Sequence, residues 1–304
     1  MHLLITGSSG LIGSAVVPAL GADGHQVTRL VRRRPQAGAR EIPWDPTSIR
    51  LDPHLLDGVD GVIHLAGEPI VGRWTAARRR RLVESRVGTT HVLAQAISES
   101  PRPPLVMIVA SATGYYGDHG ASREDLTEES PPGTGFLAEL TRQWEAAAEP
   151  ARRRGVRVVH LRNGIVLSGR GGALARMLPV YRFGLGGPLG DGAQFWSWIS
   201  IDDVVGVVRH ALTTSGPAGP VNVTTPTPVT NRQFSDTLAR VLHRPALLPV
   251  PRIALELLFG RSAAGAVLAG CRAIPKHLVA SGFRFQFPEI ESALRHLTGR
   301  RDTR

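Results

Sequence analysis

The stretch Ile5-Thr6-Gly7-Ser8-Ser9-Gly10-Leu11-Ile12-Gly13 carries three glycines with the spacing G-x-x-G-x-x-G close to the start of the chain. The apolar run before it, residues 2–5, is typical of a buried strand, and the apolar spacing of residues 14–20 after it predicts a helix. A strand, a glycine turn and a helix in this order predict a turn that binds a dinucleotide, whereas the glycine pattern alone is a weak signal.

Each glycine has its own physical role in such a turn. Gly7 can adopt backbone angles that a side chain forbids, Gly10 lets the main chain approach a pyrophosphate, and Gly13 lets the helix pack close to the strand. Free N–H groups and the positive end of the helix dipole then face the phosphates. The expected cofactor contacts in this turn are Thr6, Gly7, Gly10, Leu11, Ile12 and Gly13. The alternative is a tight strand-to-helix turn without a ligand.

Length and composition indicate an ordinary globular protein. The 304 residues can form one large domain or two modest ones, and the single cysteine, Cys271, excludes an intramolecular disulfide and any multi-cysteine metal site. The first strand begins at once, without the charged and apolar regions of a signal peptide, and no apolar run reaches about 18 residues. We therefore expect a cytoplasmic protein with no membrane partner.

The net charge of +11 does not by itself indicate a nucleic-acid partner. Of the 36 basic residues only Lys276 is a lysine, and so strong an arginine bias is explained more economically by codon composition than by selection at each site. Arginine runs at 78–81 and 152–154 lie in helical stretches and are interpreted as solvated faces. We do not expect nucleic-acid binding.

The end of the second strand predicts which dinucleotide is bound. Residues 26–31 form this strand and are followed by Arg32 and Arg33, where NAD-binding folds carry an acidic residue for the ribose 2′-hydroxyl. A carboxylate would repel a 2′-phosphate, whereas a guanidinium binds it through charge-assisted hydrogen bonds. The sequence therefore favours NADP(H) over NAD(H).

Strands alternate with helices along the first half of the chain, which predicts an α/β fold with a doubly wound parallel sheet of about seven strands. Further strands are expected at 61–67, 105–110, 156–162 and 219–224, and helices at 74–98, capped by Thr75, and at 136–154. We expect a Rossmann domain formed by 1–163 and 202–224, in which Asp202 caps a helix. A smaller, mostly helical substrate domain is expected at 164–201 and 225–304.

Two strand ends carry further candidate site residues, because ligands in open parallel sheets bind at the carboxyl ends of strands. Leu65, Ala66 and Gly67 are small or apolar residues suited to close passage of the backbone past a cofactor. Ser111-Ala-Thr-Gly-Tyr-Tyr-Gly117 places several hydroxyl groups at the end of another strand. For Ser111 the alternative is a hydroxyl that satisfies a strand-end amide, and the tyrosines could serve packing alone.

These residues resemble the short-chain dehydrogenase/reductase superfamily in its extended, epimerase-like branch. The wider match consists of Thr6 to Gly13, residues 64–67, Ser111 with Tyr116-Gly117, and residues 198–203. A narrower resemblance, to the atypical epimerase family of class 39U, spans nearly the whole chain through residues 44–46, 67–70, 114–117, 144–145, 184–187 and 275–283. It implies an NADP-type cofactor in the Rossmann domain and a small C-terminal substrate domain, but no substrate.

The chain departs from the superfamily at its catalytic pair, Tyr-x-x-x-Lys. In the superfamily the tyrosine is the general acid/base and the lysine lowers its pKa and holds the nicotinamide ribose. The corresponding residues here are Phe136, which has no hydroxyl, and Leu140, which has no ammonium group. Neither role is therefore carried over.

Other residues remain as catalytic candidates. Ser111 aligns with the superfamily's catalytic serine, and Thr113 replaces it if the turn is shifted by one; Tyr115 or Tyr116 could supply a phenol and Glu68 a carboxylate. A phenol is a poor base unless a cation lies close by. Arg86, also a candidate cofactor contact, and Arg162 could be that cation.

Several other functions are not supported. The 11 histidines show no metal-ligand spacing, and His64 and His160 are expected as core histidines within strands. The G-x-S-x-G motif of serine hydrolases is absent. The glycine-rich stretch 184–190 is either a phosphate-binding or lid segment or an irregular connector, and 254–269 is apolar enough for a core or a subunit contact.

Two functional hypotheses follow. The first is an NADP(H)-dependent oxidoreductase or epimerase acting on a small carbonyl, hydroxyl or nucleotide-sugar-like substrate between the domains. The second is a non-catalytic NADP(H)-binding module that senses the cofactor or binds another protein. We expect a monomer or a homodimer, since relatives often dimerise through helices equivalent to 75–98 and 136–154, where arginines disfavour contact in this chain.

Overall fold

A seven-stranded parallel sheet forms the centre of the molecule in the computed structural model, which describes residues 1–46, 50–213 and 216–299. The strand order is β10-β6-β5-β4-β1-β2-β3. The strands are β1 (His2–Thr6), β2 (Gln26–Val31), β3 (Glu41–Pro43), β4 (Gly61–His64), β5 (Val106–Ala112), β6 (Arg157–Asn163) and β10 (Gly219–Val223). The predicted α/β class and the number of strands are confirmed, although the short edge strand β3 was not predicted.

The order of the strands reverses at β1, which pairs in parallel with β2 on one side and with β4 on the other. In open α/β sheets, ligands bind at the carboxyl ends of strands beside such a reversal. Thr6 and His64, the last residues of β1 and β4, are register partners. The sheet topology therefore places the glycine turn and residues 65–67 at one edge of the sheet.

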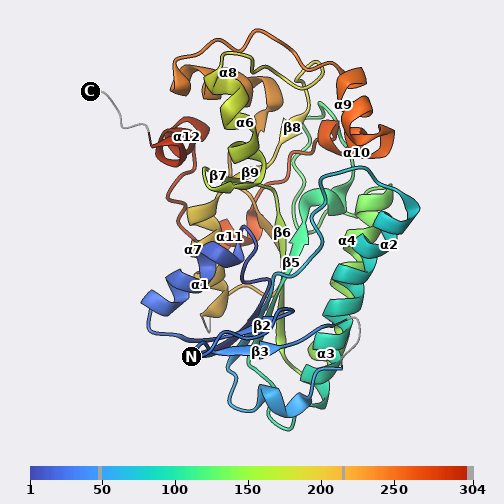
Figure 1. Cartoon of the computed structure of the whole chain (residues 1–304), viewed down its shortest axis with the longest axis vertical. Helices are drawn as coiled ribbons and strands as arrows, with labels where there is room; N and C mark the ends of the chain where they lie inside the picture. Colours follow the sequence, from blue (N-terminus) through green and yellow to red (C-terminus); the bar gives the residue numbers. More distant parts are fainter. Residues whose placement is uncertain (47–49, 214–215, 300–304) are drawn as a thin grey trace.

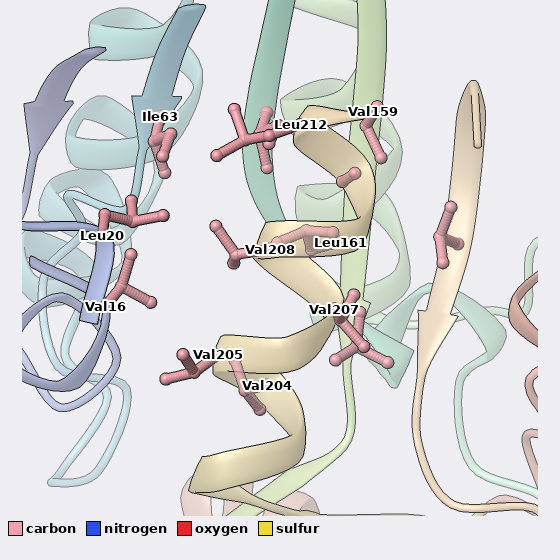
Figure 2. Close-up of a cluster of buried hydrophobic side chains, with 14 of the residues drawn as sticks. Val16, Leu20, Ile63, Val159, Leu161, Val204, Val205, Val207, Val208 and Leu212 are labelled. Carbon is pink, nitrogen blue, oxygen red and sulfur yellow. The ribbon is translucent and has the colours of Figure 1, made fainter. Parts of the chain in front are cut away.

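Helices cover both faces of the sheet and bury it. On one face, α1 (Gly13–Ala22) and α7 (Ile201–Leu212) pack a continuous apolar cluster against β5 and β6. Figure 2 shows Val205 and Val208 of α7 directed toward Val16 and Leu20 of α1. On the other face, α3 (Thr89–Glu99), α4 (Phe136–Ala146) and α5 (Glu149–Arg153) bury a second cluster.

Two long predicted helices are interrupted in the structure. The first begins at the Thr75 cap as predicted, runs through α2 (Ala76–Val83) and a π-helical turn, η2 (Glu84–Gly88), and ends with α3. The second divides into α4 and α5, and Pro150 stands in the first turn of α5. Proline is tolerated in a first turn, where its missing N–H would have had no partner.

The cap of α7 differs from the prediction. Ser200, and not Asp202, is the N-cap, because its backbone is extended and its hydroxyl accepts a hydrogen bond from the Asp203 N–H. Asp202 and Asp203 lie in the first turn, where carboxylates interact favourably with the helix dipole. By contrast, the predicted capping box at Thr230 and Gln233 is present at the start of α8 (Asn231–Leu242).

A second apolar core is formed by elements whose helices lie above the sheet in Figure 1. It is formed by side chains of α6 (Gly172–Arg182), α8 and α12 (Ile290–Thr298). Two small sheets support it, β7 (Ile165–Ser168) with β9 (Trp198–Ser200) and β8 (Phe195–Trp196) with β11 (Val229–Thr230). Leu278, Phe283 and Phe285, which the predicted division assigns to the substrate domain, pack on the first core.

The remaining elements are short. They are η1 (Pro53–Leu56), η3 (Thr113–Tyr116), α9 (Arg252–Phe259), α10 (Arg261–Leu268) and α11 (Lys276–Ala280). The apolar stretch 254–269 forms two helices because Gly260 breaks it with a φ of +79°. Within the described ranges, no helix has the length and apolar character to cross a bilayer.

Candidate functional site

The glycine turn is a tight cradle in which two glycines are sterically required. Gly7 has a φ of +70°, and a Cβ there would lie 2.5 Å from the Leu65 carbonyl carbon. A Cβ on Gly13 would lie 2.2 Å from the Gly7 carbonyl oxygen. Ile12, the residue before α1, provides no side-chain cap. Within the described residues the N–H groups of Leu11, Ile12 and Gly13 have no backbone acceptor, so they are available to an anion.

Thr6 fixes this turn to the end of β4. Its hydroxyl lies 2.7 Å from His64 Nδ1 and accepts a hydrogen bond from the Ala66 N–H. The other His64 nitrogen lies 3.2 Å from the Thr89 hydroxyl of α3. Burial lowers the pKa of His64 to about 4. His64 is therefore a neutral, hydrogen-bonded core histidine, as the sequence predicts.

This buried histidine makes stability depend on pH. An unfolded histidine titrates at its ordinary pKa of 6.5 while folded His64 stays neutral down to about 4, so the unfolded state binds more protons between these values. Its contribution is complete above pH 6.5 and is lost as pH falls toward 4, by up to about 3 kcal/mol. Urea unfolding of wild type and His64→Gln at pH 7.5 and 5 should show a smaller loss on acidification in the variant. An equal loss in both proteins would contradict this assignment.

The two arginines after β2 differ in their availability. Arg33 forms a bidentate ion pair with Glu41, with distances of 2.6 and 2.9 Å. Arg29 also contacts Glu41. The pKa of Glu41 is lowered mainly by a hydrogen bond from the backbone N–H of Gln36 and further by the hydrogen bond from Arg33. Arg32 is exposed and has no partner among the described residues. Of the two predicted contacts, Arg32 is thus the one free to bind an added anion.

Arg86 lies beside Gly67 at the end of β4. A Cβ on Gly67 would be 3.4 Å from the Arg86 guanidinium carbon, and the guanidinium donates to the Glu68 carbonyl oxygen over 2.9 Å. It also lies 5.2 Å from the ring centre of Trp144. Burial lowers the Arg86 pKa to about 10, so the group stays charged at neutral pH. Arg86 is not near the tyrosines, which leaves it as a candidate cofactor contact only.

A cavity of about 1340 Å³ opens next to the glycine turn. Its walls come from the loop after β4, from α2, η3 and α4, and from α6, β8, α9 and α10. Leu11 of the glycine turn and Thr113 of η3 both line it. Figure 1 shows α9 and α10 above α2 and α4 along one side of the molecule. The cavity therefore lies where sheet and second core meet.

The two candidate hydroxyls at the end of β5 point to different places. Ser111 is buried and donates to Glu145 Oε1 over 2.6 Å, so this residue satisfies an internal carboxylate. Thr113 lines the cavity, and the recorded partner of its side chain is the thiol of Cys271, a weak hydrogen-bonding group in the same wall. The geometry thus disfavours Ser111 as a catalytic group or cofactor contact and favours Thr113.

The two candidate tyrosines, Tyr115 and Tyr116, are not among the described residues that line the cavity. The Tyr116 hydroxyl lies 2.7 Å from Asn222 Oδ1 and accepts a hydrogen bond from Arg162 over 3.1 Å. Burial raises the Tyr116 pKa to about 12 despite the charge of Arg162. The Tyr115 ring is stacked 3.5 Å from the Arg162 guanidinium carbon. Tyr116 therefore belongs to a buried hydrogen-bond network, and the half-buried Tyr115 packs against its arginine.

Of the two candidate cations, Arg162 contacts these tyrosines. Its charge is neutralised by Glu145. Their side chains form a bidentate pair at 2.8 and 2.9 Å, and they are only 3% and 13% exposed. The sequence pattern does not identify Glu145 as a partner of Arg162, although Glu145 lies in the Trp144-Glu145 pair on which the narrower resemblance rests. This ion pair joins α4 to the end of β6, and removing either partner would leave an uncompensated buried charge.

Phe136 and Arg79 lie together in the cavity wall. Phe136 packs edge-on against Trp74, with 5.3 Å between ring centres, and the Arg79 guanidinium lies 5.2 Å from its ring. Arg79 also donates to the Ser262 hydroxyl of α10 over 2.9 Å. The sequence interpretation of 78–81 as a solvated face missed this residue, because nothing in the arginine run distinguishes it. Leu140 is buried.

One group of potential metal ligands occurs within the described ranges. Carboxylate and imidazole atoms of Glu128, Glu129 and His277 lie within 4.8 Å of one another. Lys276 already pairs with Glu129 at 3.3 Å, and Glu128 Oε1 accepts a hydrogen bond from the Asn222 N–H. Three of the cluster's groups thus already have partners within the protein, although Glu128 Oε2 has none among the described residues, and we assign no metal to the cluster.

Comparison with known proteins agrees with this geometry. The model of the NAD dependent epimerase/dehydratase family matches residues 3–224, and a domain of unknown function, DUF1731, matches residues 250–297. The chain belongs to the NAD dependent epimerase/dehydratase family. This epimerase-family chain is 44% identical to the epimerase family protein Mb2239 of Mycobacterium bovis over 297 residues, covering 97% of both chains. It is 38% identical to human epimerase family protein SDR39U1, covering 98% of this chain and 99% of that protein.

Solved structures show the same relationship. The crystal structure of human SDR39U1 with NADPH matches with a TM-score of 0.89 and 34% identity, over 98% of this chain and 99% of that one. A Corynebacterium glutamicum nucleoside-diphosphate sugar epimerase matches with a TM-score of 0.80 and 37% identity, over 98% of this chain and 58% of that one. A Bacillus cereus UDP-glucuronic acid 4-epimerase, at 18% identity, shares only the fold with this epimerase-family chain.

Proposed function

We propose that this protein is an NADP(H)-dependent oxidoreductase that acts on a carbonyl or hydroxyl group of a small molecule bound in the cavity. The observation that carries the proposal is that the glycine turn, through Leu11, borders a large cavity whose wall also contains the hydroxyl of Thr113. The NADPH in the human SDR39U1 structure supports the choice of cofactor, as does the unpaired Arg32.

The residues of the turn fit a dinucleotide at the reversal of the sheet. A side chain at Gly7 or Gly13 would collide with backbone, and the uncapped start of α1 offers N–H groups to a pyrophosphate. Arg32 would hold the 2′-phosphate, and Arg86 and residues 65–67 would line the path toward the cavity. NADPH, when bound, supplies a hydride.

Thr113 is the residue that we propose to act on the reacting oxygen. Its hydroxyl can donate a hydrogen bond to a carbonyl oxygen, whose negative charge grows as the carbonyl is reduced. The largely apolar walls lower the local dielectric constant and thereby strengthen that interaction. Because no phenol or ammonium group stands at Phe136 and Leu140, the protein positions and polarises its substrate, and the proton that completes the alcohol comes from solvent.

Replacing Thr113 by valine is expected to reduce kcat about 100-fold, because one hydrogen bond to a developing oxyanion is lost. Valine keeps the shape of threonine, so the Kd for NADPH should stay within twofold. The matched control is Ser111→Ala, which removes a hydroxyl directed at Glu145 and should retain activity in the folded fraction. Steady-state NADPH oxidation checks both variants, and the reverse ranking would transfer the role to Ser111.

The second candidate function is a cofactor-sensing module without catalysis, which the apolar Phe136 and Leu140 favour. The two functions are distinguished by incubating purified protein with NADPH and a panel of carbonyl compounds. Oxidation of NADPH is followed by the loss of absorbance at the nicotinamide band. Turnover that depends on Thr113 supports the oxidoreductase. Tight NADPH binding without turnover across a broad panel supports the sensing module instead.

A further inference from the structure

We propose that the molecule bound beside the cofactor has an apolar body and an anionic group that pairs with Arg79, and that it is not a nucleoside-diphosphate sugar. This inference rests on the proposed function, since it concerns the substrate of the same cavity. It follows from the chemistry of the cavity walls and from the charge of Arg79.

Apolar side chains make up most of the walls. Six of them illustrate the range of elements that contribute: Trp74, Phe136, Met177, Trp196, Leu255 and Val267. A ligand that fills such a space gains free energy in proportion to the apolar surface that it buries. The hydroxyl groups and ring amide of a nucleoside would instead lose water without gaining partners, which is costly.

The polar groups of the walls are largely committed to the protein itself. The Ser197 hydroxyl donates to the Cys271 carbonyl oxygen and accepts from the Ala273 N–H. The Asp118 carboxylate accepts from the N–H groups of Gly120 and Gly270. Asp118 is also the single acidic residue among the described wall residues, and its charge would repel a diphosphate placed near it. The walls therefore offer a nucleotide sugar few contacts.

Arg79 supplies a positive charge that has no acidic partner in the described part of the chain. Its recorded contacts are the Ser262 hydroxyl and the face of Phe136, and its buried Nε has no hydrogen-bond partner. A second wall arginine, Arg176, is exposed, where ion pairs are weak in water. A half-buried guanidinium beside an aromatic wall binds an anionic group of a ligand more strongly.

A fluorescent anion and its neutral analogue test this inference on NADPH-saturated protein. The probe 1-anilinonaphthalene-8-sulfonate has an aromatic body and a sulfonate, and N-phenyl-1-naphthylamine lacks the sulfonate. Arg79→Ala is expected to raise the Kd of the sulfonate probe at least tenfold and that of the neutral probe less than twofold. Arg80→Ala, on the same helix but outside the cavity wall, should change neither. Ser262→Ala removes only the hydrogen bond to Arg79 and should leave the preference for the sulfonate intact.

Competition identifies the class of ligand. Ala266→Trp narrows the cavity. The probe fluorescence that is lost in this variant therefore comes from probe bound in the cavity rather than on exposed apolar surface. This cavity-bound probe should be displaced by 4-phenylbutyrate and not by UDP-glucose. Displacement by UDP-glucose, or equal weakening of both probes in Arg79→Ala, would overturn the inference. These measurements need no turnover, so a failed search for NADPH oxidation would refute the proposed function without deciding the ligand class.

Discussion

Replacing Arg32 by alanine is expected to raise the Kd for NADPH about 10- to 100-fold and to leave the Kd for NADH within twofold. The two cofactors differ only in the 2′-phosphate, and hydrogen bonds between a guanidinium and a phosphate contribute about 1.5–3 kcal/mol. Arg32 follows the last residue of β2 and has no competing carboxylate within the described ranges. Isothermal titration of both cofactors into both proteins measures the difference.

Arg33→Ala is the matched control for this prediction. Its guanidinium is held by Glu41 at 2.6 and 2.9 Å, so its loss should change the Kd for NADPH only a few-fold. If Arg33→Ala raised the Kd for NADPH more than Arg32→Ala did, the 2′-phosphate would have to displace Glu41 from Arg33. If Arg32→Ala weakened NADH as much as NADPH, Arg32 would not be a 2′-phosphate contact at all.

Replacing Glu145 by alanine is expected to lower the free energy of unfolding by about 3–5 kcal/mol. The change removes one partner of a buried ion pair and leaves Arg162, 3% exposed, without its compensating charge. It also leaves the Ser111 hydroxyl without its acceptor. Urea denaturation followed by circular dichroism gives the change directly.

Glu139→Ala provides the comparison on the same helix, because its ion pair with Arg142 is exposed on both sides. That variant should unfold at nearly the wild-type urea concentration. The unfolding midpoint of Glu145→Gln should lie between those of Glu145→Ala and Glu139→Ala, since an amide keeps hydrogen bonds but not the charge. An unfolding midpoint of Glu145→Ala equal to that of Glu139→Ala would show that the buried network contributes little to stability.

The fold was predictable because its signals are local. The glycine spacing after a buried strand and the regular alternation of apolar strands with helices identified the sheet. The errors arose where local signals compete. Asp202 and Ser200 are both good caps, and only the extended backbone of Ser200 decides between them. The edge strand β3 has three residues, too few for an apolar pattern to appear.

The candidate site was predictable only in part, because side-chain direction at a strand end depends on tertiary contacts. Ser111 and Thr113 are two residues apart and chemically alike, yet Glu145 of α4 draws the first inward and leaves the second at the cavity. The tyrosines are candidates because of their phenols, but the Tyr116 hydroxyl is bound by Arg162 and Asn222 in the interior and the Tyr115 ring stacks on Arg162. Arg79 could not be separated from its neighbours, since its position in the cavity wall and its hydrogen bond to Ser262 of α10 are tertiary contacts.

The most direct measurement of the central claim is the transfer of deuterium from NADPH labelled at C4 of the nicotinamide, prepared separately with each face labelled. The protein is incubated with the labelled cofactor and the carbonyl compound that gives the fastest NADPH oxidation, and the alcohol product is analysed by mass spectrometry. Hydride transfer by this protein predicts one deuterium per product molecule from one of the two labelled faces, and about 100-fold slower incorporation in Thr113→Val. Binding of NADPH with no deuterium in any product from either face would contradict it.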